Sequence, residues 1–210
     1  PAQWHGEKGT LKKISTYSCD DVLQNAADDF ANELSSVTGR KITKADGSGT
    51  VHFAIDDGLA YLGDEGYEIV CTEKSITASA YTATGAVWAG KTICQLMVQG
   101  GFPCGIMRDY PRYSVRGFML DVGRKPVSMA MLEKIVNRMA WYKYNDFHIH
   151  LSDNYIWLED YAENGDESTF DAYQAFRLES DMKNDKGETA TAKDYHYSKY
   201  EFNEFMKNSA

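Results

Sequence analysis

Two apolar segments that each run directly into polar residues constrain the fold of this chain more than any other feature. Gly117 to Val122 is the first segment and Phe147 to Leu151 is the second. Between them, Ser128 is a suitable N-cap for a helix with one apolar stripe. That stripe consists of Leu132, Ile135, Val136 and Met139. Strands that are apolar on both faces are typical of parallel sheets, so the sequence predicts a β-α-β unit. Its polar residues would gather at the edge where parallel sheets and barrels build active sites.

The composition allows a packed core and argues against several classes of partner. Hydrophobic residues make up 43% of the 210 residues and aromatic residues 13%, which is ordinary for a globular protein. The net charge of −9, with no basic run, argues against nucleic acid and anionic membranes as partners. No apolar stretch approaches the ~20 residues that a membrane span requires. Cys19, Cys71, Cys94 and Cys104 lack metal-type spacing, so buried free thiols are expected.

Residues 1–112 are predicted to form a small α+β domain without a catalytic site. Proline and charges break the periodic patterns from Arg108 to Tyr113, which indicates a linker to the next domain. The predicted elements of the first domain are a strand at Leu11–Thr16, a helix from Asp20 or Asp21 to Gly39, a strand at Val51–Ile55, a hairpin of Tyr67–Thr72 with Ser75–Ala80, and a helix from Thr84 to Gly100.

Residues 113–210 are predicted to hold the first two β-α units of a (β/α)8 TIM barrel, so the fold class is α+β followed by α/β. A complete barrel typically takes ~250 residues, and the chain ends in a helix that the capping box Ser198–Glu201 opens. A truncated barrel is therefore expected, and its exposed strands predict self-association. The polar stretch from Glu159 to Asp194 is typical of a lid or a substrate loop.

Several stretches of the chain carry a resemblance to a known family. They are Asp109-Tyr-Pro-Arg-Tyr, Arg116-Gly-Phe-Met-Leu-Asp-Val-Gly-Arg124, the run from Met139 to Asn154, the run from Tyr173 to Ser180, and the run from Gly85 to Met97 in the first domain. These stretches are similar to the family-20 glycoside hydrolases, the β-N-acetylhexosaminidases. The likeness covers nearly the whole chain, and the two strand motifs together are specific.

The resemblance implies a retaining hydrolase that removes terminal N-acetylglucosamine or N-acetylgalactosamine from glycans. In that family the acetamido oxygen of the substrate attacks the anomeric carbon, a glutamic acid protonates the leaving oxygen, and the preceding aspartate orients the acetamide. The resemblance places this Asp-Glu pair beyond Ala210, so the fragment alone is expected to be inactive. It implies no metal or organic cofactor and a secreted or cell-surface location in a bacterium.

Arg124 and Asp153 are the principal candidate site residues. A guanidinium is a planar fork of donors that can bind two adjacent sugar hydroxyls, and the resemblance gives Arg124 this role; the alternative is an ion pair with Asp121. The resemblance gives Asp153 the support of a histidine on a later strand; the alternative is an ordinary strand-end aspartate. Asp121 and Asn154 are expected to shape the substrate-binding site.

Two further hypotheses remain open. His148 and His150 are spaced as paired metal ligands on one face of a strand, as in metal-dependent barrel hydrolases, although core-facing or hydrogen-bonded histidines are more common. The chain could also be a non-catalytic carbohydrate-binding or scaffold module that stacks sugars on Trp141 and Trp157. Stoichiometric zinc would favour the former, and glycan binding by this chain alone would favour the latter.

Overall fold

The computed structural model describes residues 2–153, 176–183 and 185–209. The chain divides into two compact units, unit 1 (Pro1–Ser114) and unit 2 (Val115–Ala210). None of the helices in the described ranges combines the length and the apolar character that crossing a membrane requires.

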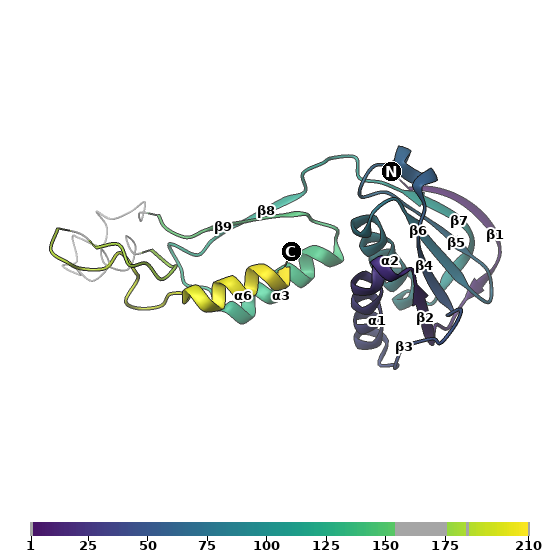
Figure 1. Ribbon diagram of the computed structural model, residues 1–210, viewed down its shortest axis with the longest axis horizontal. Coiled ribbons are helices and arrows are strands. Elements are labelled where there is room, and N and C mark those ends of the chain that lie inside the picture. The colour runs from purple at the N-terminus through teal and green to yellow at the C-terminus, as the bar shows by residue number, and fades with distance from the viewer. Residues whose placement is uncertain (1, 154–175, 184, 210) are drawn as a thin grey trace. The chain divides into compact units, whose positions relative to one another are not determined.

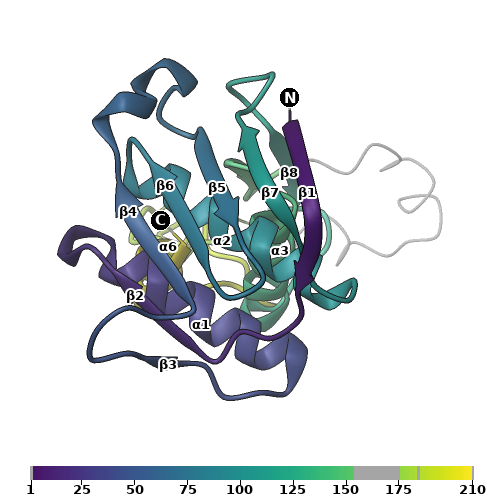
Figure 2. The same cartoon turned by 90° about the vertical axis from the view of Figure 1, so that its right-hand side faces the viewer.

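Unit 1 is a seven-stranded mixed sheet with two helices packed together against one face (Figures 1 and 2). The strand order is β1-β7-β5-β6-β4-β2-β3. The strands are β1 (Gln3–Leu11), β2 (Thr16–Cys19), β3 (Thr43–Lys44), β4 (Val51–Ile55), β5 (Tyr67–Cys71), β6 (Ile76–Ala80) and β7 (Phe102–Asp109); the helices are α1 (Gln24–Thr38) and α2 (Ala83–Val98), with 3-10 turns η1 (Asp21–Leu23) and η2 (Asp57–Leu62). Antiparallel pairing of β5 with β6 confirms the predicted hairpin.

The two helices of unit 1 form where the sequence predicted them. Helix α1 ends at Gly39, which adopts a left-handed conformation (φ 66°) that costs glycine little. Its Phe30 packs edge-on against Phe53 of β4, with ring centroids 5.1 Å apart. The side chain of Lys91 on α2 is only 7% exposed, and its ammonium group lies 2.8 Å from Asp29 and 2.6 Å from Glu33 of α1. The aromatic contact therefore joins α1 to the sheet, and the ion-pair cluster joins the two helices.

Two expectations for unit 1 were wrong. The expected strand at Leu11–Thr16 is the connection between two strands, β1 ending at Leu11 and β2 beginning at Thr16; the buried side chains of Leu11 and Ile14 produced the misleading pattern. Strand β7 was missed, and it includes the first two residues of the expected linker. The strand contains one glycine, Gly105, a residue type that weakens strands. A Cβ at this position would lie 2.3 Å from the carbonyl oxygen of His5, so the close pairing with β1 requires glycine here.

Unit 2 contains the predicted β-α-β unit. Strands β8 (Gly117–Asp121) and β9 (Asp146–His150) pair in parallel, with α3 (Met129–Trp141) between them in sequence. Helix α6 (Lys199–Ser209) lies beside α3 (Figure 1). The buried core of unit 2 consists of Val122, Leu132, Tyr197 and Phe205. Leu120 of β8 and Phe147 and Ile149 of β9 pack against this core, whereas the side chains of Phe118 and Met119 on β8 are 42% and 57% exposed.

Two expectations concern α6 and the stretch that precedes it. The capping box is confirmed, since the amide of Glu201 donates to Ser198 Oγ at 3.1 Å and the amide of Ser198 donates to Glu201 Oε2 at 3.2 Å. The stretch from Glu159 to Asp194 was expected to be a lid or a substrate loop, and this stays a prediction; the described part of the stretch is bridged to other residues of unit 2. Isolated bridges pair Phe176 with Thr191 and Leu178 with Tyr197. Arg177, which lies between Phe176 and Leu178, is buried and donates hydrogen bonds that the polar composition of the stretch does not predict.

Candidate functional site

The parallel pairing of β8 and β9 brings the polar residues at their C-terminal ends to one place. Asp121 ends β8 directly opposite His150, which ends β9. The amides of Val122 and Gly123 then both donate to the carbonyl oxygen of His150, at 3.0 Å each. The chain after β8 is therefore held against the chain after β9, and Arg124 lies beside the residues that follow β9.

Arg124 is held by two carboxylates. Its Nη1 atom lies 2.5 Å from Asp121 Oδ2, and its backbone amide donates to Asp121 Oδ1 at 3.0 Å. Its Nη2 atom lies 2.7 Å from Asp153 Oδ2. The ion pair with Asp121, which the sequence offered as the alternative to sugar binding, is thus formed. Contacts on both terminal nitrogens fix the plane of the guanidinium, and about a third of the side chain stays exposed.

Asp153 also contacts a histidine of its own chain, a partner that the sequence did not indicate. Its Oδ2 atom lies 2.8 Å from Nε2 of His150. His148 is exposed, and the centroid of its ring lies 6.2 Å from that of His150. The two histidines of β9 therefore differ in environment, because only His150 is paired with Asp153.

The positive charge of Arg124 stabilises the ionised form of Asp121. Partial burial would raise the pKa of Asp121, but hydrogen bonds from the amide and guanidinium of Arg124 oppose it, as do the charges of Arg124 and His150. Together they hold the pKa of Asp121 below its ordinary value. At neutral pH this group is a carboxylate that keeps the arginine in place.

A metal ion is a poorer occupant of this site than the arginine. In the described part of the chain, Asp121, His150 and Asp153 bring potential ligand atoms within 4.8 Å of one another. His148, half of the metal pair considered from the sequence, is not in this group. Arg124 contacts both carboxylates, so it already supplies the positive charge that a cation would bring. The geometry does not favour the metal-dependent hydrolase.

Other candidates from the sequence lie apart from this site. Asn154 and Trp157 fall outside the described residues, and Trp141 ends α3, where it is half-buried. Within the described ranges, the one adjacent Asp-Glu pair is Asp64–Glu65 in unit 1. Its glutamate accepts a hydrogen bond from Trp88 Nε1 at 2.7 Å, which is a structural role.

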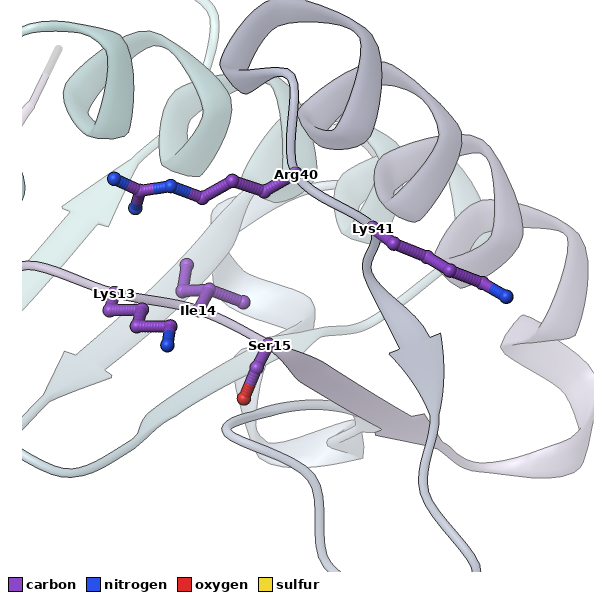
Figure 3. Close-up of a pocket in the computed structure, with 5 residues that line it drawn as sticks. All are labelled: Lys13, Ile14, Ser15, Arg40 and Lys41. Carbon is purple, nitrogen blue, oxygen red and sulfur yellow. The ribbon is translucent and has the colours of Figure 1, made fainter.

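A hollow of about 490 Å³ in unit 1 is lined by Lys13, Ile14, Ser15, Arg40 and Lys41 (Figure 3). The three cationic side chains are exposed, and in Figure 3 Lys41 points away from Lys13. Arg40 and Lys41 directly follow the C-terminal end of α1, where positive charge complements the helix dipole. Their placement is explained without a ligand.

Arg177 is the residue beside the site that the sequence analysis did not single out. Its side chain is 1% exposed and donates through Nε to the carbonyl oxygens of Val122 and Gly123, at 3.1 and 3.2 Å. It was noted only within the run from Tyr173 to Ser180. An arginine between Phe176 and Leu178 in an extended segment was the available signal, because a charge flanked by apolar residues is often buried and paired.

Two family models match the chain. The model described as glycosyl hydrolase family 20, domain 2, matches residues 1–110, and the model of the catalytic domain of the same family matches residues 113–205. A beta-hexosaminidase of Akkermansia muciniphila is 34% identical over 113 residues, which are 51% of this chain and 23% of that protein. A beta-N-acetylhexosaminidase of Cellulomonas fimi is 31% identical over 136 residues, 60% of this chain and 27% of that protein. The chain spans about a quarter of these relatives.

Solved structures share the fold over the full length of the chain. N-acetyl-beta-hexosaminidase of Streptomyces plicatus, in complex with Thio-NAglucal, matches with a TM-score of 0.73 at 24% identity, over 100% of this chain and 42% of that one. Beta-N-acetylhexosaminidase from Bacteroides fragilis matches with a TM-score of 0.72 at 20% identity, over 99% of this chain and 41% of that one. At this identity the likeness shows the fold.

Proposed function

Because the chain belongs to glycosyl hydrolase family 20, we propose that it is part of a retaining β-N-acetylhexosaminidase that removes terminal N-acetylhexosamine from glycans. The observation that carries this proposal is the placement of Arg124 between Asp121 and Asp153. The three residues lie at the C-terminal ends of two parallel strands, where α/β barrels bind their substrates. They also lie within the part of the chain that the catalytic-domain model matches.

We propose that β8 and β9 are the first two strands of a (β/α)8 barrel. Their parallel pairing across α3 supports this. So does the extent of the match, because the chain spans 42% of the Streptomyces plicatus enzyme and a complete barrel typically takes ~250 residues. The Asp-Glu pair that would orient the acetamide and protonate the leaving oxygen is proposed to lie outside these 210 residues, and the chain alone is then inactive.

Arg124 is proposed to bind two adjacent hydroxyls of the terminal sugar. The carboxylates of Asp121 and Asp153 set the plane of its guanidinium before substrate arrives, so little side-chain freedom is lost on binding. Asp153 is proposed to position other residues of the site, since its Oδ2 atom orients both the guanidinium of Arg124 and the imidazole of His150. In this scheme neither carboxylate transfers a proton.

A chromogenic assay tests the proposed function. The full-length protein that contains this chain is incubated with the 4-nitrophenyl β-glycosides of N-acetylglucosamine and N-acetylgalactosamine, and proton NMR identifies the anomer released first. We expect hydrolysis with the β-anomer as first product. The chain of 210 residues, assayed alone, should release no nitrophenol above the uncatalysed rate. Release of the α-anomer, or rapid hydrolysis by the chain alone, contradicts the proposal.

A further inference from the structure

We propose that Arg177 is a positioning residue that holds both Arg124 and Asp153 in their sugar-binding arrangement without touching the substrate. This inference rests on the proposed function of those two residues. Arg177 is the least exposed charged side chain among the described residues, at 1%. A buried guanidinium is costly unless its donors are satisfied, so the groups that satisfy it indicate what it holds.

The guanidinium fixes the backbone that leads into Arg124. Its Nε atom donates to the carbonyl oxygens of Val122 and Gly123, at 3.1 and 3.2 Å. These are the two carbonyl groups that directly precede Arg124 in the chain. They lie just beyond the end of β8. The guanidinium donates the hydrogen bonds that a further strand residue or a water molecule would otherwise have to donate to these carbonyl groups.

The main chain of Arg177 fixes the end of β9 in the same way. Its amide donates to the carbonyl oxygen of Leu151 at 3.0 Å, two residues before Asp153. The loop after β8 also touches the loop after β9, since a Cβ on Gly123 would lie 2.8 Å from Cα of Ser152 and 2.9 Å from the amide nitrogen of Asp153. One residue thus contacts both loops, through its side chain on one and its backbone on the other.

The other side of the guanidinium is anchored in the segment before α6. Its Nη1 atom pairs with Asp194 Oδ1 and donates to the carbonyl oxygen of Tyr195 at 2.9 Å. The amide of Tyr197 donates to the carbonyl oxygen of Arg177 at 2.7 Å, and Tyr197 belongs to the core of unit 2. A lysine cannot make these contacts together, because its ammonium is a single point rather than a planar fork.

A double-mutant cycle in the full-length protein tests this role. The variants are Arg177→Lys, Arg124→Lys and the pair, with Arg138→Lys on the exposed surface of α3 as the matched control. We expect Arg177→Lys to lower kcat/KM about 100-fold, the loss that a misplacement of about 1 Å produces, and Arg138→Lys to change it less than about twofold. In the Arg124→Lys background, Arg177→Lys should cost less than about fivefold, because its effect acts through the arginine already lost.

Losses that multiply in the double variant, or an unchanged kcat/KM in Arg177→Lys, would overturn the inference, since a purely structural arginine acts independently of Arg124. If Arg177→Lys does not fold, Asp194→Asn replaces it in the same cycle. That substitution keeps the guanidinium and removes its anchor, and it must show the same dependence on Arg124. An unimpaired Arg124→Lys variant contradicts the proposed sugar-binding role instead, which separates the two failures.

Discussion

The Nη2 atom of Arg124 lies 2.7 Å from Oδ2 of Asp153, so the residue that follows β8 is paired with the residue that follows β9. The same oxygen lies 2.8 Å from Nε2 of His150. One carboxylate oxygen therefore orients a guanidinium and an imidazole together. The ends of two strands that are far apart in sequence act as one unit, and changes in either loop should affect both.

Replacing Asp153 by Asn tests this shared contact. The amide removes the negative charge and offers a donor as well as an acceptor, so it cannot hold both Arg124 and His150 as the carboxylate does. A hydrogen bond to a charged group is worth about 1.5–3 kcal/mol, so kcat/KM of the full-length protein should fall about 10- to 150-fold. Asp146→Asn, at the exposed opposite end of β9, is the control. If kcat/KM of Asp153→Asn equals that of Asp146→Asn, the contacts of Asp153 with Arg124 and His150 have no role in catalysis.

Replacing Gly123 by Ala should separate the two loops. The added Cβ would meet the backbone of Ser152 and Asp153 at 2.8 to 2.9 Å, and backbone atoms cannot move aside as a flexible side chain can. We expect a loss of about 1–3 kcal/mol in the free energy of unfolding and a lower kcat/KM. Gly47→Ala is the control, because nothing lies within 4 Å of its Cβ position. If urea unfolding gives Gly123→Ala and Gly47→Ala the same free energy of unfolding, the close approach of Gly123 to the loop after β9 is contradicted.

Acid should weaken unit 2 through Asp194. Burial would raise its pKa, but hydrogen bonds from Arg177 and the backbone, with the charge of Arg177, lower it below the ordinary value of 3.8. The unfolded chain then binds protons more readily than the folded one, so the stabilisation is present above pH ~4 and is lost as the pH falls below it. Urea unfolding at pH 2.5 to 7 should show a smaller decline for Asp194→Asn, which starts less stable. If the free energy of unfolding falls equally with decreasing pH in the unchanged protein and in Asp194→Asn, ionised Asp194 does not contribute to stability.

The exposed apolar side chains of β8 predict self-association of the 210-residue chain. Phe118 and Met119, which are adjacent and therefore point to opposite faces of β8, are 42% and 57% exposed. Sedimentation velocity should show association that increases with concentration, and Met119→Lys should reduce it. Met182→Lys, at a 75% exposed position away from the strands, should not. A monomer at all concentrations would contradict this prediction.

The parts of the fold that follow from local patterns were predictable from the sequence. The β-α-β unit, both helices of unit 1 and the capping box at Ser198 depend on periodicity and caps within a few residues. The gathering of Asp121, Arg124 and Asp153 followed from the rule that parallel strands end at one edge.

The parts that depend on distant partners were not predictable. Strand β7 is stabilised by pairing with β1 and β5, and its central Gly105 is not typical of a strand when only local sequence is considered. Arg177 is buried because carbonyl groups from two other segments accept its hydrogen bonds. The pairing of Asp153 with His150 depends on the turn after β9, a geometry that spacing alone does not define.

The most direct test is the steady-state kinetics of Arg124→Lys beside Arg138→Lys in the full-length protein, with a chromogenic N-acetylhexosaminide. Lysine keeps the charge but loses the planar fork that would bind two hydroxyls. We predict a fall in kcat/KM of about 10- to 150-fold, the loss of one hydrogen bond to a charged group, with an unchanged thermal midpoint and an unaffected control. Wild-type kinetics in Arg124→Lys would contradict the assignment of this arginine to sugar binding.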